Sequence, residues 1–457
     1  MAANLSTIKV IDQSQVAPTS GSVSTTTIPL TFFDIPWFLC PPIQWIWFYE
    51  LPYPTLHFTQ TVLPRLKESL SLTLRHFFPF AAKITCPPPP HHPYIVYNEG
   101  DAIQVTVSES EVLFNHFVGN RARDIKILQS FFPKLPVAHL SSNDDTQVVP
   151  TMAIQFTVFP NSGISIGLTF NHVVTDGRSL QHFMNSWAFI HRSHEEDFTS
   201  LSLPYYKRDV IKDTQGFTSI IVKDLRNGGK DLDVVGEVST PNNVLITFMI
   251  KRAKTEQLKH SITTQSKLVD ELRQVHMSTY VVTCAFMWVN LMKLQEQIRG
   301  SSDDDDRLYY FVFVADCRER FELCIPGAYF GNCLTYGYVS AKKRDLMGED
   351  GIAVASIAIG RKIFELRKGG ALIGAEKWVS NYKQVVKDGR FVTVAGSPKF
   401  REYEIDFGWG KPKKSDLVQL APYSCFSLTG SREDNEGIDI GIIIEQHKFD
   451  LFNALFE

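Results

Sequence analysis

The 457-residue chain has no excess of basic residues. Its 46 Lys and Arg are balanced by 49 Asp and Glu, so the formal net charge is −3. An extended nucleic-acid surface needs a basic excess to neutralise phosphates. We therefore expect no nucleic-acid partner, although a local basic patch for a phosphorylated small molecule remains compatible with this charge.

Cysteines are few, odd in number and scattered, and no Cys-x-x-Cys pair occurs. The seven positions are Cys40, Cys86, Cys284, Cys317, Cys324, Cys333 and Cys425. This distribution fits free thiols in a reducing compartment better than a disulfide framework. The sequence thus predicts a cytoplasmic protein.

The chain also lacks a long uninterrupted apolar run. Its first residues show no charged segment followed by an apolar one, so we expect no signal peptide. The stretch 29–48 is apolar and aromatic, but four prolines and Asp34 interrupt it. We expect no membrane-spanning segment and no membrane partner.

Size and composition indicate a two-domain globular protein. Hydrophobic residues make up 44% and charged residues 21% of the chain, and one hydrophobic core rarely organises 457 residues. We predict an N-terminal domain at 1–200, a crossover segment at 201–242 and a C-terminal domain at 243–457. The 33 Phe, 15 Tyr and 7 Trp either fill cores or line a pocket for a flat ligand.

Hydrophobic periodicity predicts both strands and helices in each half. Alternation over 154–158 and 164–170, around a turn at 160–163, indicates an antiparallel hairpin. Helical spacing appears over 63–77 and again from Ser179. The second half shows strands near 244–250, 308–314 and 438–444, and helices near 284–294 and 352–366. The predicted fold class is α/β, with two domains of mixed sheet and flanking helices.

The segment 171–178, Asn-His-Val-Val-Thr-Asp-Gly-Arg, carries the strongest chemical signal. His172 stands at the end of an apolar strand, where an imidazole can act as a general base or can simply be a hydrogen-bonded core residue. Asp176 could orient the imidazole or cap the helix that begins near Gly177, and the tight turn favours the cap. Arg178 is either solvated or pairs with an anionic group of a substrate.

Other motifs have competing interpretations. Gly163-Ile-Ser-Ile-Gly167 matches the serine-hydrolase pattern, but Ser165 lies inside an alternating strand rather than on a sharp turn, which favours a chance match. Arg318 follows a buried strand and needs a carboxylate partner, with Asp176 and Asp316 as the alternatives. No histidine or carboxylate cluster has metal-site spacing, so we expect no metal.

Two further motifs accompany His172: Tyr-Phe-Gly-Asn-Cys at 329–333 and Asp-Phe-Gly-Trp-Gly at 406–410. His-x-x-x-Asp at 172–176 followed by Asp-Phe-Gly-Trp-Gly resembles the plant BAHD acyl-CoA-dependent acyltransferases. The motif at 329–333 is similar to the branch that acylates anthocyanin and flavonoid glycosides. Leu-Thr-Phe-Phe-Asp at 30–34, Ala-Asp-Cys-Arg at 315–318 and Ala-Gly-Ser-Pro at 395–398 resemble that branch too.

The resemblance implies two similar-sized domains like those of chloramphenicol acetyltransferase, with a channel between them. It implies a monomer that holds no permanent cofactor and uses acyl-CoA and a phenolic glycoside as small-molecule substrates. His172 would be the general base, and Asp176 would form a structural ion pair with Arg318. The loop formed by Asp406, Gly408, Trp409 and Gly410 would support the fold or CoA binding.

The acyl donor remains open at this stage. Arg178 stands where many malonyl-transferring members of the branch carry lysine, and its charge slightly favours malonyl-CoA, whereas the aromatic content also suits hydroxycinnamoyl-CoA. Thr393 is a candidate oxyanion donor, and Lys254 and Lys259 are candidates for CoA phosphates. The alternative to an active enzyme is a catalytically silent relative of the family that only binds ligands.

Overall fold

The structure is a computed structural model that describes residues 8–119, 121–141, 144–193, 202–226, 242–300, 304–318, 323–434 and 436–456. The chain forms two compact units. The first comprises Met1–Pro241, Leu323–Cys333 and Phe400–Gln419, and the second comprises Asn242–Glu322, Leu334–Lys399 and Leu420–Glu457. The mixture of helices and sheets in each confirms the predicted α/β class.

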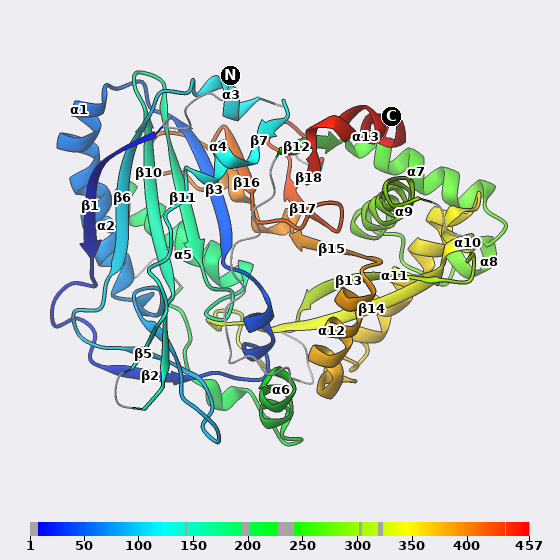
Figure 1. The fold of residues 1–457 in the computed structure, drawn as a ribbon, viewed down its shortest axis with the longest axis horizontal. Helices are drawn as coiled ribbons and strands as arrows, with labels where there is room; N and C mark the ends of the chain where they lie inside the picture. The colour runs from blue at the N-terminus through cyan, green and yellow to red at the C-terminus, as the bar shows by residue number, and fades with distance from the viewer. Residues whose placement is uncertain are drawn as a thin grey trace. The chain divides into compact units, whose positions relative to one another are not determined.

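A six-stranded mixed sheet organises the first unit, in the order β1-β6-β10-β11-β3-β16. These strands are Ile8–Val16, Ile103–Ser110, Met152–Phe159, Gly163–Phe170, Ile43–Glu50 and Lys414–Leu417, respectively. Strands β10 and β11 form the predicted antiparallel hairpin, with Phe159 opposite Gly163 (Figure 1). Every residue of both strands is buried, so their polar side chains face protein and need partners there. Gln155 Nε2 donates to Ser130 O at 2.9 Å, and Thr169 Oγ1 donates to Pro133 O at 2.8 Å.

Two segments from the predicted C-terminal domain group with the first unit. The reason is non-local pairing: β16 runs antiparallel to β3, with Lys414 opposite Phe48. The motifs at 329–333 and 406–410 lie in these two segments, whereas the sequence places both in the domain at 243–457. Of the predicted crossover, residues 201 and 227–241 lie outside the described ranges, and α6 (Phe217–Arg226) forms in the remainder.

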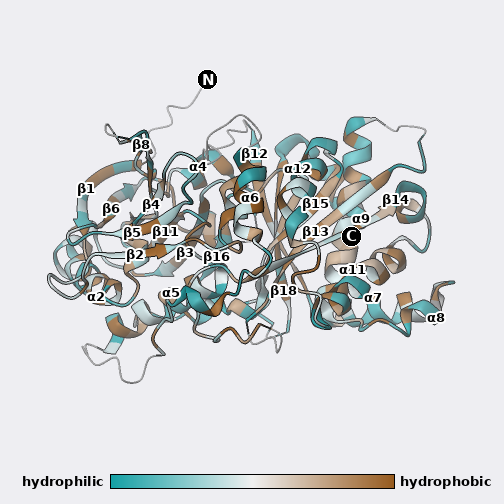
Figure 2. Ribbon diagram, turned by 90° about the horizontal axis from the view of Figure 1, so that it is seen from below, coloured by the Kyte–Doolittle hydropathy of each residue, from teal (hydrophilic) through white to brown (hydrophobic). Residues whose placement is uncertain are grey.

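The apolar spacing predicts helices here, and α2 (Leu63–Leu74) and α5 (Gly177–Ser193) form and pack against each other in the first unit. Both carry hydrophobic and hydrophilic segments (Figure 2).

A second, five-stranded sheet has the order β2-β5-β4-β9-β8. Its strands are Thr26–Pro29, Tyr94–Tyr97, Lys83–Cys86, Gln147–Pro150 and His139–Leu140. The remaining elements of this unit are η1 (Ile35–Leu39), α1 (Thr55–His57), η2 (Phe58–Val62), η3 (Phe78–Phe80), α3 (Asn115–Val118), β7 (Arg123–Asp124), α4 (Ile125–Gln129), η4 (Arg208–Val210) and η7 (Glu402–Glu404).

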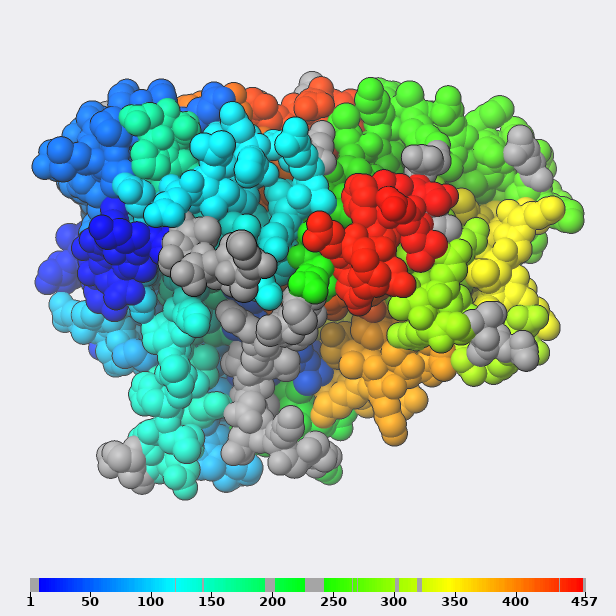
Figure 3. Space-filling view, turned by 45° about the horizontal axis from the view of Figure 1, so that its top comes forward, coloured from blue at the N-terminus to red at the C-terminus, as the bar shows by residue number. Residues whose placement is uncertain are grey.

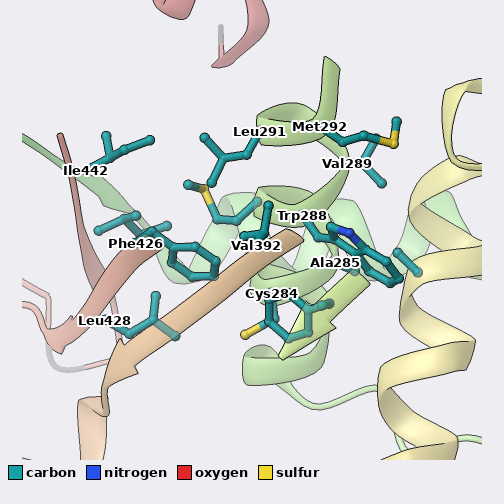
Figure 4. Close-up of a cluster of buried hydrophobic side chains, with 14 of the residues drawn as sticks. Cys284, Ala285, Trp288, Val289, Leu291, Met292, Val392, Phe426, Leu428 and Ile442 are labelled. Atoms are coloured by element: carbon teal, nitrogen blue, oxygen red, sulfur yellow. The ribbon is translucent and has the colours of Figure 1, made fainter. Parts of the chain in front are cut away.

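The second unit places its strands in the order β14-β13-β15-β17-β18-β12. They are Leu334–Lys342, Leu308–Asp316, Phe391–Gly396, Cys425–Gly430, Ile438–Glu445 and Asn243–Ile250. Helix α9 (Thr279–Arg299) is buried along most of its length, and its side chains pack with Val392, Phe426 and Leu428 of the sheet (Figure 4). The strands predicted near 244–250, 308–314 and 438–444 and the helices predicted near 284–294 and 352–366 are therefore confirmed.

The other helices of this unit are α7 (Arg252–Gln265), α8 (Val269–Leu272), α10 (Lys343–Met347), α11 (Gly351–Arg367), η5 (Ala375–Lys377), α12 (Trp378–Asp388), η6 (Pro398–Phe400, whose last residue belongs to the first unit), η8 (Gln446–Lys448) and α13 (Phe449–Phe456). Helix α13 is visible at the molecular surface (Figure 3). Among the described helices, none combines the length and apolarity needed to traverse a bilayer.

Candidate active site

His172 lies just beyond the end of β11 and is half-buried. Its backbone is held in a turn, because Thr175 N donates to His172 O at 3.3 Å. Its ring nitrogen Nδ1 lies 3.0 Å from Oδ1 of Asn332. The described residues supply no hydrogen-bond partner for the other ring nitrogen, Nε2.

The side chain of Asn332 fixes the tautomer of the imidazole. Asn332 Nδ2 has three acceptors in reach: His172 O at 2.8 Å, Val173 O at 3.2 Å and an oxygen of Asp34 at 3.2 Å. The amide nitrogen must face these acceptors, so Oδ1 faces the ring and accepts from Nδ1–H. The lone pair of the neutral imidazole is consequently on Nε2, the nitrogen available to a substrate.

The surroundings keep this imidazole neutral and fix its plane. Trp37, on η1, stacks on the ring with a centroid separation of 3.5 Å and an interplanar angle of 11°. Burial lowers the pKa of His172 to about 4, and the opposing charges of Asp176 and Asp34 only partly offset this effect. A general base must be unprotonated and correctly oriented, and this imidazole is both neutral and held in place.

Asp176 begins the helix that follows. Its Oδ1 accepts from Ser179 N at 3.0 Å, which is the bonding of a helix cap, and its Oδ2 accepts from Cys333 N at 3.2 Å. The side chain therefore joins the start of α5 to the end of the Tyr-Phe-Gly-Asn-Cys segment, next to Asn332. In this way it acts on the histidine through backbone placement.

Gly177 is required by close packing. A Cβ atom at this position would lie 2.5 Å from Cε2 of Phe400, in the segment that groups with the first unit. No real Cβ tolerates that distance, so any larger residue would displace the aromatic ring or the helix start. The glycine of the His-x-x-x-Asp-Gly sequence thus has a steric role.

The Asp-Phe-Gly-Trp-Gly loop is built around one carboxylate. Asp406 Oδ1 accepts from Gly408 N at 2.7 Å and from Gly410 N at 3.0 Å, and both glycines adopt positive φ. The rings of Phe407 and Trp409 stack on each other and meet Tyr49 of β3 edge-on. Within the first unit this loop supports the fold.

Comparisons with known proteins agree with this geometry. The Transferase family matches residues 6–457. A coumaroyl-CoA:anthocyanidin 3-O-glucoside-6''-O-coumaroyltransferase of Arabidopsis thaliana is 36% identical over 470 aligned residues, covering 100% of this chain and 98% of that protein. A phenolic glucoside malonyltransferase of Nicotiana tabacum is also 36% identical, covering 90% of this chain and 89% of that protein.

The chain belongs to the BAHD acyltransferase family. The crystal structure of vinorine synthase shares its fold, with a TM-score of 0.68 at 18% identity, covering 97% of this chain and 96% of that one. BAHD enzymes are acyl-CoA-dependent acyltransferases. Acyl-CoA is thus a co-substrate here, and no permanent cofactor is required.

The serine-hydrolase pattern in this BAHD chain is a chance match. Ser165 lies inside β11, between Thr157 and Phe48 on the neighbouring strands, and is fully buried. A nucleophile must stand on an exposed turn to reach a substrate.

The remaining predicted residues lie in described parts of the chain. Arg178 is on the first turn of α5 and is partly exposed, and its charge contributes to the lowered pKa of His182 one turn later. In the second unit, Arg318 Nη1 lies 3.2 Å from Asp316 Oδ1, one of its two sequence alternatives. The ion pair of Arg318 with Asp176, implied by the family, stays a prediction.

Three further candidates belong to the second unit. Thr393 Oγ1 donates to Ser424 O at 3.3 Å, so an oxyanion role would require it to leave that bond. Lys259 Nζ pairs with Glu256 at 2.7 Å, and Lys254 is exposed on the same helix, α7. Their roles toward the thioester and CoA stay predictions. The described residues contain no group of three His, Cys, Asp or Glu side chains able to hold a metal.

Three residues of the site were not identified by sequence reasoning: Asn332, Asp34 and Trp37. Two of them stand inside motifs that were recognised only as family likeness, at 329–333 and 30–34. Their roles were not recognised because the hydrogen-bond partners of Asn332 and Asp34 are distant in sequence.

Proposed function

We propose that this enzyme transfers an acyl group from a CoA thioester to a sugar hydroxyl of an anthocyanin, flavonoid or other phenolic glucoside. The observation that carries the proposal is the neutral, fixed imidazole of His172, with Nδ1 held by Asn332 and its lone pair on Nε2. The names of the Arabidopsis and Nicotiana relatives support the acceptor class, since both describe acyl transfer to glucosides of phenolic compounds.

In this mechanism the sugar hydroxyl oxygen attacks the thioester carbonyl carbon while its proton moves to Nε2 of His172. The carbonyl oxygen becomes an oxyanion, for which Thr393 is the proposed donor. Collapse of the tetrahedral intermediate breaks the carbon–sulfur bond, and the imidazolium returns its proton to the thiolate of CoA. No covalent enzyme intermediate is needed, because both substrates are held together. Lys254 and Lys259 are proposed to contact CoA phosphates.

The test is incubation of the protein with a panel of acyl-CoAs and phenolic glucosides, followed by product masses. We expect one glucoside to gain the mass of a single acyl group with release of free CoA. A protein that binds both substrates but yields no product with any pair would instead be the catalytically silent relative. Cleavage of esters with labelling of Ser165 by a serine-directed phosphonate would contradict the proposal outright.

For the donor we propose malonyl-CoA ahead of a hydroxycinnamoyl-CoA, because Arg178 places a cation on the first turn of α5, six residues after His172. A malonyl group ends in a carboxylate that can pair with a guanidinium. Relatives at 36% identity include two proteins named for coumaroyl-CoA and one named for malonyl transfer, so the sequence likeness alone does not choose malonyl-CoA.

Replacement of Arg178 by glutamine separates the donors. Loss of a hydrogen bond to a charged group costs about 1.5–3 kcal/mol, which corresponds to a fall of about 10- to 100-fold in kcat/KM for malonyl-CoA. Coumaroyl-CoA, which has no carboxylate, should be used as before, and Arg178→Lys should retain most malonyl transfer. Steady-state kinetics with each CoA ester measure both values of kcat/KM. An unchanged kcat/KM for malonyl-CoA in Arg178→Gln would contradict the donor assignment.

We further propose that the enzyme is a cytoplasmic monomer. The seven cysteines are odd in number and scattered, without a Cys-x-x-Cys pair, which supports a reducing compartment. Its molar mass in solution, measured by light scattering against the sequence mass of 51.8 kDa, tests the monomer.

A further inference from the structure

Asp34 is a fully buried carboxylate that is linked to the imidazole of His172 through Asn332. Its Oδ2 accepts from Thr31 N at 2.9 Å and from Thr31 Oγ1 at 2.8 Å, which closes a local turn. Its Oδ1 accepts from Asn332 N at 2.9 Å and from Asn332 Nδ2 at 3.2 Å. No Lys or Arg in the described ranges forms an ion pair with it. Four neutral donors therefore stabilise a buried charge that would otherwise be costly.

Two of these four hydrogen bonds, those of Asp34 Oδ1, do not stabilise the local turn. The turn at Thr31 needs only Oδ2, whereas Oδ1 reaches a residue 298 positions away in the chain. The residue reached is the one whose side-chain oxygen contacts His172. Asp34, Asn332 and His172 thus form one line of hydrogen bonds, from the buried anion through a neutral amide to Nδ1.

This line has a chemical consequence for the base. An anion that accepts from Nδ2 polarises the amide, so Oδ1 becomes a better acceptor for Nδ1–H, and most of all when the ring becomes imidazolium. The interposed amide also cannot take the proton from the ring, because an amide oxygen is a very weak base. The arrangement orients the ring and stabilises its charge in the transition state, as a directly bonded aspartate does in a Ser-His-Asp triad.

The same short segment also supplies the stacking partner of the ring. Trp37 N donates to Asp34 O at 3.2 Å at the start of η1, and the Trp37 indole covers the imidazole face. Residues 31–37 therefore determine both the plane of the ring and its hydrogen-bonded edge.

We infer that Asp34 is a positioning residue of the acyl-transfer reaction, acting on His172 through Asn332. The inference rests on the proposed role of His172 as general base. It assigns a specific task to a buried residue that is hydrogen-bonded to Asn332, the partner of the imidazole.

Nitrogen NMR of the unmodified enzyme tests the first step without any activity measurement. Protein labelled with ¹⁵N-histidine should show His172, assigned by its loss in His172→Gln, as a neutral imidazole with the proton on Nδ1. A proton on Nε2 would overturn the inference, because Asn332 Oδ1 would then face a lone pair. This readout is independent of whether the proposed substrates are correct.

The second step compares Asp34→Asn with the unmodified enzyme. The asparagine keeps the shape but has one acceptor oxygen and no charge. If its NH₂ group faces the Asn332 donors, the line of bonds breaks; if it faces the Thr31 donors, the line persists without the anion that polarises the amide. We expect kcat to fall by about 10- to 100-fold, the range typical of outer hydrogen-bond partners of functional histidines, with KM for both substrates changed less than about threefold. The His172 resonances should show a mixture of tautomers.

Asp213→Asn is the matched control. Asp213 also holds two backbone amides, Phe217 N at 2.7 Å and Thr218 N at 2.9 Å, but it does so at the start of α6. It should lose some stability while kcat and the His172 resonances stay unchanged. Asp34→Asn with unchanged kcat per folded molecule and an unchanged tautomer would overturn the inference, and if this variant does not fold, the nitrogen NMR of the unmodified enzyme decides alone.

Discussion

Replacement of His172 by alanine should abolish acyl transfer while leaving acyl-CoA binding intact. General-base catalysis contributes about 10²–10⁴-fold, so kcat should fall by at least that range if proton removal limits the rate. Because burial lowers the pKa of the imidazole to about 4, the base is already deprotonated near neutral pH, and its loss removes the group that accepts the hydroxyl proton. Single-turnover kinetics and calorimetric titration with acyl-CoA measure the two quantities.

Two variants make this test specific. His172→Gln keeps a side chain of similar reach and should be as inactive as the alanine variant, which separates loss of the base from loss of packing against Trp37. His76→Ala removes another half-buried histidine whose pKa is lowered, by burial and by Arg75, and should retain turnover. Turnover by His172→Gln within tenfold of the unmodified enzyme would exclude the imidazole as the base.

The elements around His172 could be predicted because their signals are local. The hairpin of β10 and β11 follows from alternating apolar residues, and α5 follows from Leu180, Phe183 and Trp187 at helical spacing. His172 itself was found because it lies where the alternating pattern of a strand gives way to the spacing of a helix. Periodicity of this kind reports the face that a residue occupies, not its partner.

The partners of His172 could not be predicted for the same reason. The contact between His172 and Asn332 spans 160 residues, and the contact between Asn332 and Asp34 spans 298. Nothing in the pattern near any of these three residues indicates the other two. Only the closure of distant segments brings a buried anion, an amide and an imidazole into line.

The grouping of Phe400–Gln419 with the first unit has the same origin. The segment is held by backbone hydrogen bonds between β16 and β3 and by side-chain contacts, among them Trp45 Nε1 donating to Ser415 Oγ at 3.0 Å, and none of these has a sequence period. The local signals of the segment, a glycine-rich loop and a short strand, fit either half of the chain equally well. One of these contacts is the ion pair between Asp416 and Arg123 of β7, whose side chains are only 3% and 2% exposed.

Removal of that contact should therefore give the largest loss of stability. Arg123 Nη2 donates to Asp416 Oδ1 at 3.0 Å, and Arg123 Nη1 also donates to Asp416 and to Phe117 O. Asp416→Ala would leave the guanidinium buried without its carboxylate, which typically costs about 3–5 kcal/mol. Denaturant unfolding of the first unit should report a decrease of this size in the free energy of unfolding.

The origin of this cost can be tested by removing both charges. Arg123→Met combined with Asp416→Leu leaves no uncompensated charge, so it should recover most of the loss, as apolar replacements of buried ion pairs often do. Asp12→Ala is the control at an exposed pair, where Lys67 Nζ lies 2.8 Å from Asp12 Oδ2, and it should cost less than about 1 kcal/mol. If Asp416→Ala costs no more than Asp12→Ala, the segment is held by the β16–β3 backbone pairing, and the ion pair is not what joins residues 400–419 to the sheet that positions His172.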